Sequence, residues 1–155
     1  SVLLHDVPVR EGAPFAAAAE AAGVDQIFIA PPHASEETLA GVARHSRGYI
    51  YAVSRVGVTG AEWESSTDGL ADVVANLKRF GGVPPLLGFG ISTPTHVADA
   101  VAAGAAGAIS GSAITALIAQ HCSDSPGERR TVDDIDTLKA ELREFVAAMK
   151  AATRR

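Results

Sequence analysis

Two glycine-rich turns, each between a short apolar run and a helix-forming segment, constrain this chain more than any other feature. The first is Gly88-Phe89-Gly90 and the second is the run from Gly107 to Ser112. Glycine lets a backbone approach an anion closely, and a helix that begins at such a turn adds free N–H groups and the positive end of its dipole. One such turn is explained by tight strand-to-helix geometry alone. The consecutive pair favours a phosphate site.

Short apolar runs alternate with helical patterns along the chain. Strands are expected to start near residues 2, 27, 49, 86 and 108, with helices between them, which predicts α/β units with parallel strands. Such units fit either an open doubly wound sheet or the last five βα units of a (β/α)8 TIM barrel. In that barrel the common phosphate site lies after the seventh and eighth strands. Because the sequence opens inside an apolar run at Ser1, we favour the barrel, with about 100 residues preceding this portion.

Local signals predict where helices begin and end. Hydroxyl side chains at Ser35 and Thr93 are expected to cap the first turns of two helices. Gly23 and Gly104 are expected to end two others, because glycine adopts the left-handed conformation that closes a helix. The pattern Thr131-x-x-Asp134 resembles a capping box before a last amphipathic helix.

Composition narrows the function classes. With 155 residues, 47% of them hydrophobic, the chain is expected to form a single domain over residues 1–155. A net charge of −5 and basic runs of no more than two residues argue against a nucleic-acid partner. No apolar run approaches the roughly 18 residues of a membrane span. The single cysteine, Cys122, is typical of a protein of the reducing cytoplasm. With nucleic-acid and membrane roles disfavoured, we expect the chain to act on a small molecule.

Several motifs stand in the order and spacing of the tryptophan synthase alpha subunit family. The segment from Ser54 to Gly60 and the terminal run from Phe145 to Ala152 are specific to that family among phosphate-binding barrels. The match covers nearly the whole chain, which resembles the part of the subunit from about the fourth barrel strand to the end. The other motifs are Asp6-Val7-Pro8-Val9, Pro31-Pro32, Gly48-Tyr49-Ile50-Tyr51, Gly88-Phe89-Gly90-Ile91-Ser92 and the run from Gly104 to Ala113.

The resemblance implies an activity and a partner. Members of the family cleave indole-3-glycerol phosphate to indole and glyceraldehyde 3-phosphate in tryptophan biosynthesis, and indole passes to a beta subunit that carries pyridoxal phosphate. No cofactor is implied in the alpha chain itself. The catalytic glutamate and aspartate of the family match no residue here, so this portion would lack acid–base chemistry and be inactive alone. His5 and Trp63 depart from the family pattern, and nothing in the sequence explains either.

The resemblance also implies a set of substrate-binding positions. Backbone N–H groups and one hydroxyl would hold the phosphate, as neutral donors can. Aromatic and aliphatic side chains would flank the indole ring, although they could equally be ordinary barrel core. Thr59 would hydrogen-bond the absent catalytic aspartate. The positions are Leu3, Tyr51, Thr59, Gly60, Gly88, Phe89, Gly90, Ile109, Gly111 and Ser112.

Two other functions stay open. An isomerase acting on a phosphosugar would need a carboxylate or a cysteine at a strand end, and Asp6 is the only obvious candidate. A non-catalytic half-barrel would bind phosphate or a partner subunit without turnover. The five histidines show no spacing typical of a metal site, so no metal is expected. The long polar stretch from Ser54 to Gly69 is expected to be a lid over the site.

Overall fold

The strands that the structure describes are all parallel, and within each of two neighbouring sheets their order follows the chain. The structure is a computed structural model that describes residues 1–53, 69–123 and 131–154. Strand β1 (Val2–Leu3) pairs with β2 (Gln26–Ile27), and β3 (Ile29–Ala30), β4 (Ile50–Val53), β5 (Pro85–Gly88) and β6 (Gly107–Ala108) form the neighbouring sheet. Only Phe28 separates β2 from β3, so one extended segment pairs with β1 through its first half and with β4 through its second.

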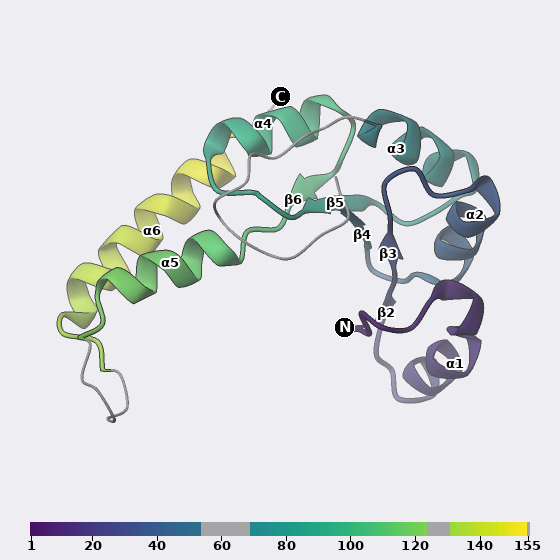
Figure 1. Cartoon of the computed structure of the whole chain (residues 1–155), viewed down its shortest axis with the longest axis horizontal. Coiled ribbons are helices and arrows are strands. Elements are labelled where there is room, and N and C mark those ends of the chain that lie inside the picture. Colours follow the sequence, from purple (N-terminus) through teal and green to yellow (C-terminus); the bar gives the residue numbers. More distant parts are fainter. Residues whose placement is uncertain (54–68, 124–130, 155) are drawn as a thin grey trace.

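Helices η1 and α1 to α4 lie in the intervals between strands, and α5 and α6 follow the last strand, β6. Figure 1 shows α1 to α4 along the outer curve of the strands, with α5 and α6 packed together beyond β6. Because the strand order never reverses, the doubly wound alternative is excluded, and the predicted partial (β/α)8 barrel is confirmed. The helices are the 3₁₀ turn η1 (Val9–Glu11), α1 (Ala13–Ala21), α2 (Glu36–His45), α3 (Leu70–Arg79), α4 (Pro94–Ala102), α5 (Ser112–Gln120) and α6 (Ile135–Ala151).

Two helices begin at the hydroxyl N-caps that were predicted for them, Ser35 and Thr93. The Thr38 N–H donates to Ser35 Oγ at 3.2 Å at the start of α2. At the start of α4, the His96 N–H donates to Thr93 Oγ1 at 3.3 Å. Each bond satisfies an N–H group that has no acceptor within its own helix.

Glycines end α1 and α4, also as predicted. Gly23 has a φ of +66° and Gly104 a φ of +103°, conformations that side chains with a Cβ rarely adopt. After α1, the Gly23 N–H donates to Glu20 and the Val24 N–H to Ala19, which is the paired bonding of a Schellman motif. The chain therefore turns sharply from each helix into the following strand.

The predicted capping box before α6 is wrong. Asp134 is the N-cap itself, because its Oδ1 accepts from the N–H groups of Asp136 and Thr137 at 3.0 Å each. Thr131 lies outside the cap, where its carbonyl accepts from the Ser123 N–H. The backbone and hydroxyl bonds from Thr137 hold the pKa of the Asp134 carboxyl below its ordinary value, so the cap is ionised at neutral pH.

Apolar side chains fill the space between the strands and the outer helices in two clusters. The first lies among β3, β4, α2 and α3, and the second lies among β4, β5, α4 and α6. In this way the helices exclude water from the sheet face that they cover. The first cluster contains Phe28, Ala30, Leu39, Val42, Ala43, Ile50, Val73 and Leu77; the second contains Ala52, Leu70, Leu87, Ile91, Val97, Ala100, Ala105 and Met149.

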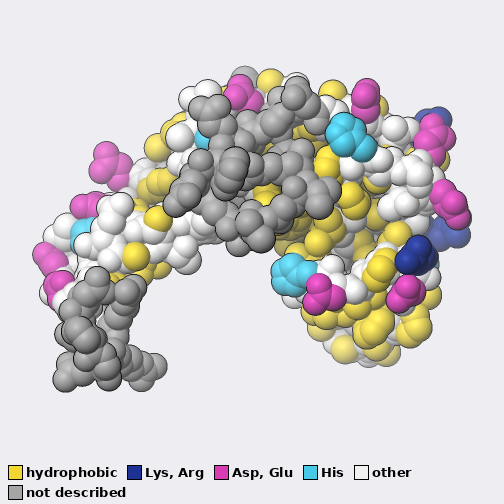
Figure 2. Space-filling view, viewed as in Figure 1, with side chains coloured by type: hydrophobic (Ala, Val, Ile, Leu, Met, Phe, Trp, Pro, Cys, Tyr) yellow, Lys and Arg dark blue, Asp and Glu magenta, His cyan; other side chains and the backbone are white. Residues whose placement is uncertain are grey.

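Charged side chains lie on the periphery. In Figure 2 the visible Lys and Arg side chains lie at the end of the molecule that carries α1 to α3, beside acidic ones. Arg79 pairs with Glu36 at 2.7 Å. At the other end, His121 after α5 lies 2.9 Å from Glu141 of α6. Within the described residues, no helix has both the length and the apolar character to cross a bilayer.

Val42→Ala should destabilise the fold far more than Val146→Ala. Both valines lie within helices, so the change in helix propensity is the same, but Val42 is fully buried and Val146 is 52% exposed. We expect Val42→Ala to lower the free energy of unfolding by about 2 kcal/mol, because apolar contact is lost and a cavity forms. Urea denaturation of the two variants measures the difference. Equal losses would show that the first cluster is not the core.

Candidate functional site

A small cavity of about 100 Å³ lies where the chain leaves β4, β5 and β6. In parallel strands the carboxyl ends share one edge of the sheet, so the turns that follow β5 and β6 lie next to each other. Ile91 is the one lining residue that was not among the positions predicted from the sequence. The lining residues are Tyr51, Phe89, Gly90, Ile91, Ile109, Gly111 and Ser112.

Two aromatic rings form one part of the lining. The Tyr51 and Phe89 rings lie edge to face, with centroids 6.4 Å apart and an interplanar angle of 86°. This geometry is favourable for aromatic pairs and offers a flat apolar ligand both ring faces and ring edges. Gly88 makes the arrangement possible, because a Cβ there would overlap the Tyr51 ring.

The turn after β5 has an uncommon backbone. Phe89 and Gly90 both have a φ of +71°. Glycine adopts this conformation at little cost, but a bulky residue such as Phe89 does so only where the surroundings hold it. Backbone strain of this kind clusters at ligand-binding and catalytic sites. The turn exposes the Gly90 backbone to the cavity without a side chain in front of it.

The turn after β6 ends at an uncapped helix N-terminus. Gly111 is the N-cap of α5 and supplies no side-chain hydrogen bond, and Ser112 is the first helical residue. The first N–H groups of a helix and the positive end of its dipole favour an anion at this position. Since Gly111 and Ser112 also line the cavity, the structure places this N-terminus opposite the Gly90 turn.

Two hydrogen bonds that involve side chains hold the loops after β5 and β6, and neither bond was predicted from the sequence. Ser110 Oγ donates to the Ile91 carbonyl at 2.7 Å, across 19 residues of chain. The Ser92 N–H donates to His96 Nδ1 at 3.3 Å, so this ring nitrogen is the acceptor. The first bond has no local sequence signal, because Ser110 and Ile91 come together only when β5 and β6 pair.

The described residues of the lining carry no formal charge at neutral pH. Tyr51 is its one titratable side chain, and burial, followed by the nearby Tyr49, raises the pKa of the phenol above its ordinary value of 10.0. Among these described residues, backbone dipoles and hydroxyls are the groups that could bind an anion. Across residues 1–53, 69–123 and 131–154, no group of three or more His, Cys, Asp or Glu side chains could hold a metal ion.

The other predicted site residues lie elsewhere. Leu3 is a half-buried residue of β1, pairs with Ile27 and does not line this cavity. Gly88 lies at the end of β5, behind the Tyr51 ring. Thr59, Gly60 and the predicted lid fall within residues 54–68, outside the described residues.

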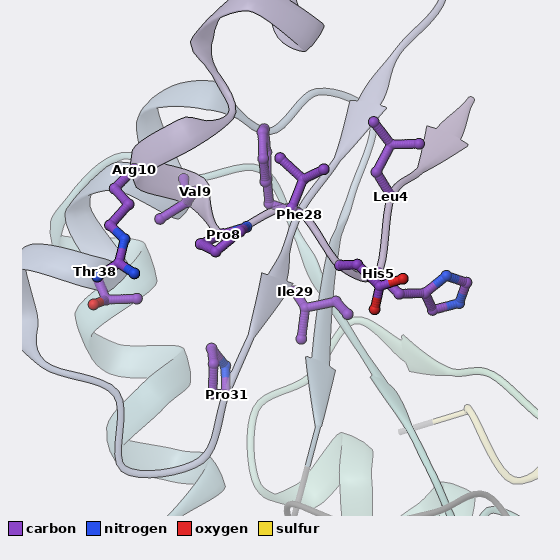
Figure 3. Close-up of a pocket in the computed structure, with 11 residues that line it drawn as sticks. Leu4, His5, Pro8, Val9, Arg10, Phe28, Ile29, Pro31 and Thr38 are labelled. Carbon is purple, nitrogen blue, oxygen red and sulfur yellow. The ribbon is translucent and has the colours of Figure 1, made fainter.

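A second cavity, of about 330 Å³, follows β1 (Figure 3). Figure 3 shows apolar side chains such as Phe28, Ile29 and Leu4 around it, with Arg10 and Thr38 at one side. Asp6, the alternative catalytic carboxylate, lines this cavity and is exposed. It is therefore not among the residues that surround Gly90 and Ser112.

Comparison with known proteins identifies a family. The family model described as tryptophan synthase alpha chain matches residues 1–153. The tryptophan synthase alpha chain of Corynebacterium efficiens is 66% identical over 155 residues, which are 100% of this chain and 55% of that relative. The chain thus spans about half the length of the curated relatives it matches.

Solved structures support the same fold. A structure of Mycobacterium tuberculosis tryptophan synthase has a TM-score of 0.74 at 27% identity, covering 99% of this chain and 51% of that chain. The tryptophan synthase a2b2 complex of Pyrococcus furiosus has a TM-score of 0.71 at 22% identity, covering 96% of this chain and 53% of that chain.

Substitutions in the two turns should weaken the binding of inorganic phosphate to different extents. Ser112→Ala removes one donor while the backbone donors remain, so we expect a loss of about 1 kcal/mol, or about fivefold in affinity. Gly90→Val should lose more, because a branched residue is strained at a φ of +71° and would occupy the anion's space. Calorimetry measures both affinities. Ser123→Ala, beyond the far end of α5, serves as the control and should bind normally; unchanged affinity in the first two variants would mean that the turns are only structural.

Tyr51 should titrate above its ordinary pKa and make stability fall at high pH. Because burial favours the neutral phenol, the unfolded chain ionises first as the pH rises through 10.0. The stability contribution of the neutral phenol is therefore complete below that pH and is lost as the pH rises toward the folded pKa. A phenolate absorbance titration of the unaltered chain minus that of Tyr51→Phe isolates this group. A difference titration centred at or below 10.0 would contradict burial as the cause.

Proposed function

Because the chain belongs to the tryptophan synthase alpha chain family, we propose that it supplies the phosphate- and indole-binding loops of a lyase that cleaves indole-3-glycerol phosphate. The products of the whole enzyme would be indole and glyceraldehyde 3-phosphate, in tryptophan biosynthesis. The observation that carries the proposal is the small cavity, which has an aromatic pair in one part of its lining and two backbone turns, at Gly90 and at Gly111, in the other.

The two parts of the lining match the two parts of this substrate. The Gly90 turn and the N-terminus of α5 would hold the phosphate through N–H groups, with Ser112 Oγ as a further donor. The Tyr51 and Phe89 rings, with Ile109, would contact the indole ring. A cavity of about 100 Å³ is smaller than a typical site for a ligand of this size, so residues beyond the described ones would complete it.

The acid–base step would come from outside this chain. The glutamate and aspartate of the family match no residue here, so this portion would bind substrate without turning it over. By resemblance to the family, Thr59 positions the catalytic aspartate, Gly60 adds a phosphate contact, and Leu3 extends the apolar wall. These three assignments rest on the resemblance alone.

The whole enzyme would work with a partner subunit. The Pyrococcus furiosus relative is a tryptophan synthase a2b2 complex, and we extend this assembly to the present chain as part of the proposal. The beta subunit would hold pyridoxal phosphate and consume the indole. The alpha chain itself would need no cofactor, and it would act in the cytoplasm.

Incubation of the chain with indole-3-glycerol phosphate tests the proposal. We expect indole-3-glycerol phosphate to bind saturably, as measured by calorimetry, and no indole to be released. Adding the purified remaining portion of a relative, with its catalytic carboxylates, should restore indole release. Sugar isomerisation would support the isomerase alternative, in which Asp6 acts from the second cavity. Binding of inorganic phosphate alone, with no preference for the indole derivative, would support a non-catalytic half-barrel.

A further inference from the structure

The bond from Ser110 to the Ile91 carbonyl joins the two loops from outside the cavity. Ser110 does not line the cavity, whereas its neighbours Ile109 and Gly111 do, as does Ile91. Its hydroxyl bonds the Ile91 carbonyl, and Ser110 lines a different cavity, beside Ile91, Val97 and Met149. The donor–acceptor distance of 2.7 Å is at the preferred length for a hydroxyl hydrogen bond.

The peptide unit between Ile91 and Ser92 is fixed at both of its polar atoms. Its carbonyl oxygen accepts from Ser110, and its N–H donates to His96 Nδ1 at 3.3 Å. The Ile91 side chain is 3% exposed and packs in the second core cluster. This peptide can therefore hardly rotate while both bonds are made.

The fixed peptide follows directly on the turn that needs support. Phe89 and Gly90 lie in the left-handed region, and Phe89 stays there only if its surroundings hold it. A peptide anchored one residue beyond Gly90, between Ile91 and Ser92, restricts relaxation of the turn toward an ordinary extended backbone. Because the donor belongs to the β6–α5 loop, the same bond sets the position of the Gly90 turn relative to the N-terminus of α5.

We infer that Ser110 is a positioning residue that holds the two halves of the anion site in register. The inference rests on the proposed phosphate-binding function and goes beyond it by naming a residue that never touches the ligand. Ser110 lowers the cost of binding by fixing the donors before the anion arrives. Loss of the Ser110 hydrogen bond should therefore change phosphate affinity and local order in the two loops, while the two apolar clusters keep the chain folded.

Three variants of the chain test the inference with inorganic phosphate as the probe. Ser110→Ala should weaken phosphate binding by about three- to tenfold, the equivalent of one intramolecular hydrogen bond. Ser110→Thr keeps the hydroxyl and should restore affinity to within about twofold. Ser123→Ala removes a hydroxyl beyond the far end of α5, outside both loops, so it should bind as the unaltered chain does.

Amide resonances give a readout that a merely structural role would not move. In the ligand-free Ser110→Ala variant, exchange of the Gly90 and Ser92 amides should accelerate while the amides of α2 and α3 keep their protection. Equal affinity in the unaltered chain and in Ser110→Ala would overturn the inference while leaving the phosphate site intact. A loss in Ser123→Ala as large as that in Ser110→Ala would also overturn it. If the unaltered chain shows no saturable phosphate shifts, both the proposed function and the inference fail.

Discussion

Parallel pairing of consecutive strands is the constraint on which the rest of the structure depends. Since β4, β5 and β6 run in one direction, each must be followed by a return through the outer layer, and every strand ends at the same edge. The loops at this edge can vary in sequence more than the strands and helices can, because the side chains of strands and helices must pack in the core. The site is thus a product of the pairing direction, and its residues come from segments that are far apart in the sequence.

If the proposed phosphate-binding role holds, the uncharged described lining would have physical advantages for a phosphorylated ligand that must leave again. Backbone N–H groups are fixed by the fold, so they need little reorganisation when an anion arrives. A lysine or arginine would bring a long side chain whose ordering opposes binding. The neutral Tyr51 phenol also avoids a negative charge beside the phosphate. Selectivity then depends on shape and on the placement of donors, which is why the loop geometry matters more than composition.

The regular features of this structure could be predicted from sequence, because their causes are local. Ser35 and Thr93 are caps by chemistry, and Gly23 and Gly104 end helices because of backbone sterics. The strand order followed from the repeated βα pattern. Thr131 was misleading, because a hydroxyl three residues before an acidic one resembles a box even when Asp134 alone caps the helix.

Other features had no local cause and could not be predicted. The exchange of partners at Phe28 lies inside an uninterrupted apolar run and depends on the neighbouring strands. The bond between Ser110 and Ile91 requires β5 and β6 to be paired first. Six of the predicted positions do surround one cavity, but the resemblance, and not their spacing, selected them.

The close approach of Gly88 to the Tyr51 ring places an evolutionary constraint on two positions that are distant in the chain. The ring occupies the volume that a Cβ at position 88 would need, so the two residues form one steric unit. The constraint runs in one direction, because a residue with a Cβ at 88 fits only if the Tyr51 ring is moved or replaced by a smaller side chain. Across related chains these positions should covary, and a lineage that gained alanine at 88 would have to lose the aromatic ring first.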